Sequence, residues 1–146
     1  MLLVVKHKHN QKQILKIYLK KLDLIKQYCK SDISLSHHQK QRIILFLDRC
    51  IYFCKTMKII QYDKTVYKFN GQVVISSINQ YRTYCSIYNM LQNLLKELTA
   101  DVDLEFQHKI QLSKCLGYTI AHVLGKLNHK NVDPHLTSQR GKSVNL

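Results

Sequence analysis

The chain has 146 residues, of which 45% are apolar, a size and composition typical of one domain folded around a hydrophobic core. Its 23 Lys and Arg outnumber its 9 Asp and Glu, which gives a formal net charge of +14. This excess favours a polyanionic partner, with nucleic acid first and an anionic membrane surface second. No apolar run is long enough for a signal peptide or a membrane span, so we expect an intracellular protein without a membrane partner.

The five cysteines lie in apolar, helix-like stretches, and an odd number so placed does not predict a disulfide framework. Free, buried thiols in a reducing compartment are therefore expected. Cys50 and Cys54 are four residues apart, but no CxxC pair and no HExxH motif accompanies them. We predict no metal site and no cofactor.

Two amphipathic helices are predicted in the first part of the chain. The first covers residues 11–30, and the second covers residues 37–59 after a break at residues 31–36. Ser36 and Gln39 have the spacing of a capping box at the start of the second helix.

A β-hairpin is predicted for residues 65–76. Two arms rich in β-branched and aromatic residues flank Asn70-Gly71, and both of these turn residues tolerate the positive φ that a tight hairpin turn requires. A single hairpin would therefore interrupt an otherwise helical chain.

A third helix is predicted to run from about residue 77 to Leu98, and a fourth over residues 104–124. Residues 129–146 have almost no apolar pattern and are interpreted as a flexible basic tail. The predicted fold is thus mainly α: a four-helix arrangement in one domain over residues 1–128, with the hairpin inserted and the tail appended.

A row of cations recurs every fourth residue along the first predicted helix, away from its apolar face. This lysine stripe consists of Lys8, Lys12, Lys16 and Lys20, of which Lys8 belongs to the series only if the helix starts before residue 11. Ordinary solvated faces mix charges of both signs, whereas residues 6–22 contain no acid. We therefore predict that the stripe contacts the phosphate backbone of a nucleic acid.

Further cations gather around the second helix. Helix N-termini attract phosphates, and a helix after a short turn is the arrangement of a helix-turn-helix recognition helix. The full set of predicted nucleic-acid-binding residues is Lys8, Lys12, Lys16, Lys20, Lys21, His37, His38, Arg42 and Arg49.

Three tyrosines, Tyr81, Tyr84 and Tyr88, share one face of the third predicted helix. Tyrosine is favoured at interfaces where one end of the side chain stays wet, so these residues are predicted to form an oligomer interface or to lie in the core. Base stacking is a further alternative. No phosphate-binding loop, nucleophile elbow or spaced carboxylate pair occurs, so we expect no enzymatic activity.

The order of elements resembles the small subunit of tailed-phage terminases over residues 15–100. The features that carry the resemblance are a Tyr/Cys-containing helical stretch at 46–54, a short β element at 66–75 around Gly71, and a helix closing at Leu94–Leu98. The resemblance implies a non-catalytic, ring-forming subunit that recognises viral duplex DNA for packaging. It also implies that the basic helices contact DNA, that the tyrosine helix helps assembly, and that the tail engages the large packaging subunit.

Two other functions fit the same composition. A structural RNA-binding protein, such as an organellar or ribosomal component, would also carry a high positive charge and a basic tail. An adaptor or inhibitor from a mobile element would use its basic face to dock an acidic protein, and it would ignore nucleic acid.

Overall fold

The computed structural model describes the backbone of residues 2–61 and 75–128 and the side chains of residues 11–61 and 75–127. The described residues form four helices and no strand: α1 (Leu2–Ser31), α2 (His37–Thr56), α4 (Ile78–Ala100) and α5 (Phe106–Asn128). The mainly helical, four-helix prediction is confirmed. The predicted hairpin lies almost wholly at residues 62–74, and the predicted tail at residues 129–146, both outside the described residues.

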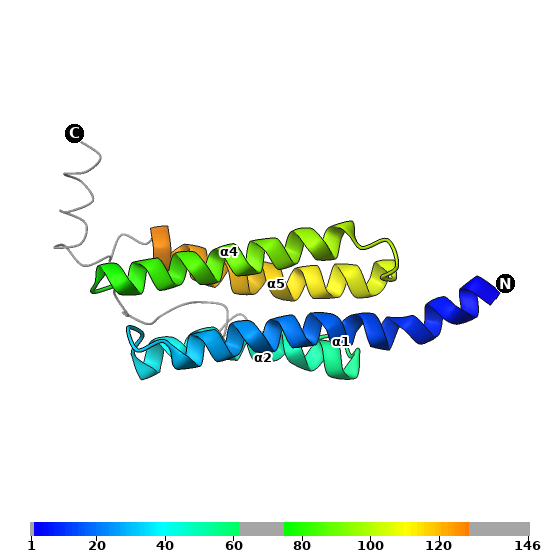
Figure 1. The fold of residues 1–146 in the computed structure, drawn as a ribbon, viewed down its shortest axis with the longest axis horizontal. Helices are drawn as coiled ribbons and strands as arrows, with labels where there is room; N and C mark the ends of the chain where they lie inside the picture. The colour runs from blue at the N-terminus through cyan, green and yellow to red at the C-terminus, as the bar shows by residue number, and fades with distance from the viewer. Residues whose placement is uncertain (1, 62–74, 129–146) are drawn as a thin grey trace, which may run out of the picture.

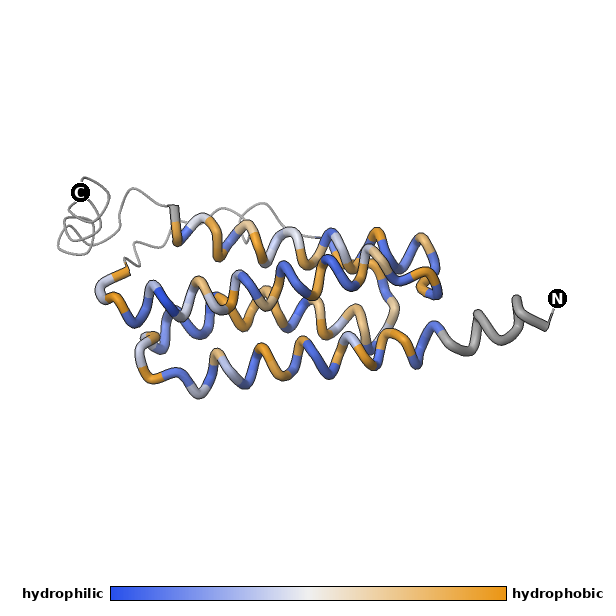
Figure 2. Tube along the Cα trace, turned by 45° about the horizontal axis from the view of Figure 1, so that its top comes forward, coloured by the Kyte–Doolittle hydropathy of each residue, from blue (hydrophilic) through white to orange (hydrophobic). Residues whose placement is uncertain are grey.

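Each helix forms because one face is apolar at the helical repeat, and these faces meet in a single core. Figure 2 shows apolar and polar residues alternating along every helix. One buried cluster takes residues from all four helices, among them Leu15 and Leu22 of α1, Leu47 of α2, Leu91 of α4 and Leu116 of α5.

The neighbours around the bundle are α1 and α2, α2 and α5, α5 and α4, and α4 and α1 (Figure 1). Helices α1 and α5 are therefore diagonal to each other. The short α1–α2 and α4–α5 turns make antiparallel pairs, whereas α2 and α4 run in the same direction. Four-helix bundles with one long crossover have this topology.

The boundaries of α2 follow from its capping groups. The amide of Gln39 donates to Ser36 Oγ at 3.2 Å, and the Gln39 side chain accepts from the Ser36 amide at 2.8 Å, which is the predicted capping box. At the other end Met57 adopts φ 58°, and its amide donates to Phe53 O. This left-handed residue ends the helix at Thr56, so the prediction that the helix continues to residue 59 was wrong.

Polar contacts fix both ends of the bundle. At one end, Thr83 Oγ1 of α4 donates to Asp32 Oδ2 at 2.8 Å, and Gln80 Nε2 donates to Ser34 O at 2.8 Å. Burial raises the pKa of Asp32, but hydrogen bonds from Ser34 and Thr83 outweigh it and hold the pKa below its usual range. These bonds tie the α1–α2 turn to the start of α4.

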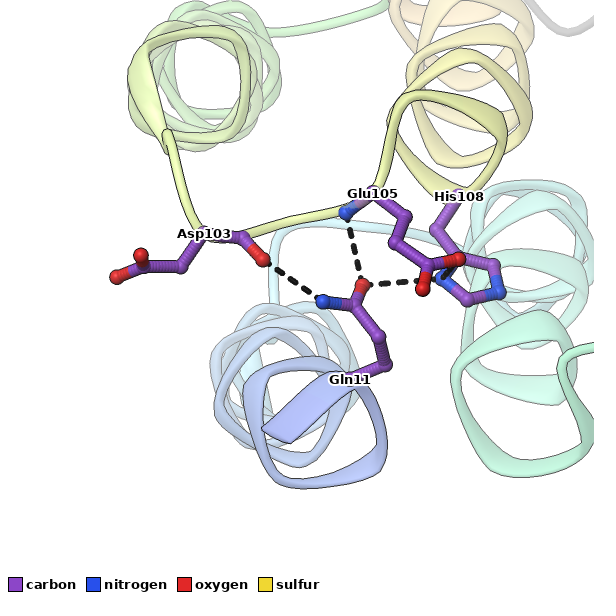
Figure 3. A network of polar contacts seen from close by, with 4 residues as sticks. All are labelled: Gln11, Asp103, Glu105 and His108. Carbon is purple, nitrogen blue, oxygen red and sulfur yellow. Dashed lines mark hydrogen bonds and ion pairs between the residues drawn. The ribbon is translucent and has the colours of Figure 1, made fainter. Parts of the chain in front are cut away.

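At the other end, Gln11 of α1 binds the α4–α5 turn (Figure 3). Its Nε2 donates to Asp103 O at 2.7 Å, and its Oε1 accepts from the Glu105 amide at 2.8 Å. His108 Nδ1 lies 3.1 Å from the same oxygen. Gln11 is only 1% exposed, so these bonds to the turn satisfy a side-chain amide that is buried.

Candidate nucleic-acid interface

Helix α1 occupies a corner of the bundle, and two ion pairs mark the limits of its open face. Lys21 binds Glu97 of α4, and Lys26 Nζ lies 2.7 Å from Asp48 Oδ1 of α2. At 3.6 residues per turn the two lysines point about 140° apart, one toward each neighbouring helix. The residues between these limits on the far side of α1 face solvent.

The described part of the lysine stripe lies on this open face. Lys12, Lys16 and Lys20 are all exposed, and successive members are one turn, about 6 Å, apart along the axis. None of the three forms an ion pair within the described part of the chain. Asp23 is exposed on the same face but does not pair with them. The stripe therefore keeps its positive charge, whereas Lys21, which belongs to the predicted set, is compensated by Glu97.

The stripe extends at both ends. Lys8 lies within α1, because the helix begins at Leu2 rather than at the predicted residue 11; the side chain of Lys8 is outside the described set. Lys30 is exposed and comes 18 residues after Lys12, which is five full turns, so it shares that side of the helix. Lys30 was not predicted from the sequence, because it does not follow the four-residue spacing of the other stripe lysines.

His37 and His38 begin α2 and are exposed. They lie beyond the α1–α2 turn rather than on the open face of α1. Figure 1 shows α2 lying antiparallel along α1. A helix-turn-helix motif crosses its helices at roughly 90–120°, so the helical hairpin here does not have that geometry.

Arg42 is separate from the stripe because it belongs to the seam between α2 and α5. It acts electrostatically on two residues of α5, His122 and Lys126. Burial and the two nearby cations lower the pKa of His122 to about 4, and its ring stacks on Phe46 with centroids 4.9 Å apart. Burial and Arg42 lower the pKa of Lys126 to about 8. The sequence did not predict a role for His122 or Lys126, because only the packing of α5 against α2 brings them close to Arg42.

Arg49 is also partly buried, and it lines a surface hollow with Leu45, Tyr52 and two residues beyond α2, Ile59 and Ile60. The structure therefore does not join Arg42 and Arg49 to the lysine stripe in one surface. Of the nine predicted binding residues, only the three described stripe lysines are shown to share one exposed surface without ion-pair partners among the described residues.

The predicted oligomer interface requires a correction. Tyr84 is 1% exposed and lies in the protein's own core, where burial raises the pKa of its hydroxyl, so it is not available to another copy. Tyr81 and Tyr88 are partly buried against that core and keep an accessible edge. The core alternative thus holds for Tyr84.

Within the described residues no group of His, Cys, Asp and Glu side chains is arranged to hold a metal ion. All five cysteines are free thiols; Cys85 is partly exposed and the other four are buried. Burial raises the pKa of Cys29 to about 11 and, with Cys115 nearby, that of Cys54 to about 12. These groups therefore pack as small apolar side chains.

No described helix has the length and apolar character needed to cross a membrane. No protein-family model, curated protein or solved structure matches this chain.

Proposed function

We propose that this protein binds duplex DNA through the phosphate backbone, along the open face of α1, and that its role is non-catalytic. One observation carries the proposal. Lys12, Lys16 and Lys20 are exposed and form no ion pair with any residue that the structure describes, while Lys21 and Lys26 at the limits of the face are bound to carboxylates. Unbalanced cations held in a row repel one another at a small cost, and a polyanion alongside them removes that cost.

The shape of the site favours a duplex over a single strand. The stripe lies along one helix, and the stretch from Lys12 to Lys20 covers about 12 Å, a length over which a DNA duplex carries about 7 phosphates. Single-strand binders add aromatic side chains on which bases stack. The tyrosines of α1 do not offer such a platform, because Tyr18 is 2% exposed and Tyr28 is partly buried.

Contacts to phosphates position a protein without selecting a base sequence. A chain that supplies such contacts fits an assembly or scaffolding role better than sequence recognition. The resemblance to terminase small subunits supports a narrower proposal, in which this protein presents viral DNA to a packaging motor. In that narrower proposal the basic helices contact the DNA, the tyrosine helix helps assembly, and the tail, which lies outside the described residues, engages the motor subunit.

The test compares two triple variants of equal charge. In the first, Lys12, Lys16 and Lys20 are changed to Gln; in the second, Lys55, Lys58 and Lys96, which are exposed on other parts of the structure, are changed to Gln. Binding to a fluorescent DNA duplex of random sequence is measured by anisotropy at several salt concentrations. If each stripe lysine meets one phosphate, the slope of log K against log salt falls by about 2.7 in the first variant.

The control variant should keep both its affinity and its salt dependence. Equal weakening in both variants would mean that net charge, rather than the stripe, drives binding. An RNA duplex or single strand that binds more tightly than DNA would favour the structural RNA-binding function. A parent protein that ignores every nucleic acid would remove the proposal and leave the adaptor function.

A further inference from the structure

A recess lined by polar side chains lies at the end of the bundle where the α1–α2 turn meets the start of α4 (Figure 1). We call this recess the polar hollow. Its volume is about 460 Å³, which is within the range of small-molecule sites. Every lining residue except Ile33 has a polar side chain, and the lining includes Tyr28, Ser31, Asp32, Asn79, Arg82 and Ser86.

Several hydrogen-bond donors of the polar hollow are not used by the fold. Arg82 is exposed and forms no ion pair or hydrogen bond with any residue that the structure describes. The side chains of Tyr28, Asn79 and Ser86 also form no hydrogen bond within the described part of the chain. A guanidinium, two hydroxyls and an amide therefore line one recess and remain available to a ligand.

Asp32, the acid of the polar hollow, is bound by the protein itself. Its Oδ1 accepts from the Ser34 amide at 2.8 Å and from the Ser34 hydroxyl, and its Oδ2 accepts from Thr83 Oγ1 at 2.8 Å. These bonds hold the carboxylate against the α1–α2 turn. Asp32 therefore stabilises the wall of the hollow and leaves the Arg82 guanidinium to an external partner.

Cations outnumber this acid around the polar hollow. Lys30 is exposed and precedes Ser31 in the chain, and Lys40 Nζ donates to Lys30 O at 2.8 Å. Together with Arg82, these lysines place three positive charges near the carboxylate of Asp32. The local field therefore favours an anionic ligand.

We propose that the polar hollow binds a phosphate monoester, with the Arg82 guanidinium holding two of its terminal oxygens. The planar guanidinium fork matches two phosphate oxygens, and serine, asparagine and tyrosine side chains commonly donate to phosphates. A terminal phosphate has three acceptor oxygens and a charge of about −1.5 to −2 at pH 7, so it uses more of these donors than a carboxylate would. The ring of Tyr28 and the exposed Ile33 offer apolar surface to the group that carries the phosphate.

Two sources supply this chemistry: a mononucleotide, and the 5′-phosphorylated end of a DNA duplex. The inference goes beyond the proposed function and does not depend on it. Arg82 belongs to α4, whereas the lysine stripe belongs to α1. The two sites can therefore be removed one at a time.

The experiment is a titration of the full, ¹⁵N-labelled chain with adenosine 5′-monophosphate at constant ionic strength, followed by NMR. We expect saturable shifts at the Arg82 side-chain N–H and at the amides of Ser31 and Ser86, and no such shifts with adenosine. Arg82→Gln should weaken binding about tenfold or more, since it removes a charge-assisted hydrogen-bond donor.

Lys96→Gln is the matched control, because it removes the same charge from an exposed position of α4 outside the lining of the hollow and should leave the affinity unchanged. The amide spectrum checks that both variants remain folded. A response that stays linear up to about 10 mM, ten times a Kd of about 1 mM, overturns the proposal. So does equal binding of adenosine, or an Arg82→Gln variant that binds as tightly as the parent.

Duplexes with and without a 5′-phosphate distinguish the two sources. A preference for the phosphorylated duplex that Arg82→Gln abolishes identifies the DNA end as the ligand. Equal affinity for both duplexes, with adenosine 5′-monophosphate still bound at Arg82, identifies the mononucleotide. The variant of Lys12, Lys16 and Lys20 should still bind adenosine 5′-monophosphate, so the failure of one proposal can be told from the failure of the other.

Discussion

The hydroxyl of Tyr18 on α1 donates a 2.6 Å hydrogen bond to Oδ2 of Asp101, 83 residues further along the chain. The other carboxylate oxygen of Asp101 accepts from the Asp103 amide at 3.0 Å. This single aspartate therefore fixes the α4–α5 turn and attaches it to the middle of α1. Burial and the hydrogen bond to Asp101 raise the pKa of Tyr18.

Changing Tyr18 to Phe should lower the free energy of unfolding by about 1.5–3 kcal/mol, the range for hydrogen bonds to charged groups. The aromatic ring keeps its place in the core, so only the hydroxyl is lost. Urea denaturation measures the effect. Tyr52→Phe is the control, because Tyr52 is 48% exposed and its removal should change stability by less than about 0.5 kcal/mol.

The Gln11 contacts also predict a loss of stability. Gln11→Ala leaves the partly buried Glu105 amide without the partner it has now, at about 1–3 kcal/mol, whereas the carbonyl of the exposed Asp103 can accept from water instead. We also expect faster hydrogen exchange at the Glu105 amide, measured by NMR. The exposed neighbour Gln13, changed to Ala, should affect neither quantity. Unchanged exchange at Glu105 would show that Gln11 does not hold the turn.

His122 predicts loss of stability in acid. Its pKa is about 4 in the folded protein, below the ordinary value of 6.5, so the unfolded chain binds its proton more readily. The contribution of the neutral His122 to the free energy of unfolding is fully present above pH 6.5 and is lost as the pH falls toward 4. The expected loss of stability between pH 7 and pH 4.5 is about 2 kcal/mol.

The comparison is urea denaturation at both pH values for the parent and for His122→Phe, which keeps a ring against Phe46. The variant should lose less stability in acid than the parent. His38→Phe removes an exposed histidine and should retain the parental dependence. Identical acid sensitivity in all three proteins would contradict the role of His122.

The thiols should differ sharply in reactivity. Burial raises the pKa values of Cys29, Cys50 and Cys54, and Cys115 is fully buried, so little reactive thiolate is accessible at pH 8. Cys85 is partly exposed and should be labelled first by a maleimide, as mass spectrometry can show. In denaturant all five should react. Early labelling of Cys50 or Cys115 in the native protein would mean that the α2–α5 seam opens.

Sequence patterns were sufficient to predict the four helices, because an apolar stripe and a capping box are local features. The Ser36 and Gln39 box begins α2 where it was expected. The end of α2 was not predicted, since it depends on the left-handed conformation of Met57, a residue with no strong preference for it. The crossover that makes α2 and α4 parallel is equally invisible to periodicity.

The sequence by itself determined that Lys12, Lys16 and Lys20 share one face of a helix, since residue spacing and helical geometry suffice for that. Only the tertiary structure decided which cations keep their charge uncompensated. Lys20 and Lys21 are adjacent in sequence, yet Lys20 is exposed, whereas Lys21 forms an ion pair with Glu97 of α4, 76 residues further along the chain. The same holds for Tyr84, which packing placed in the core. Periodicity fixes the direction of a side chain, whereas its partners depend on which elements the fold brings beside it.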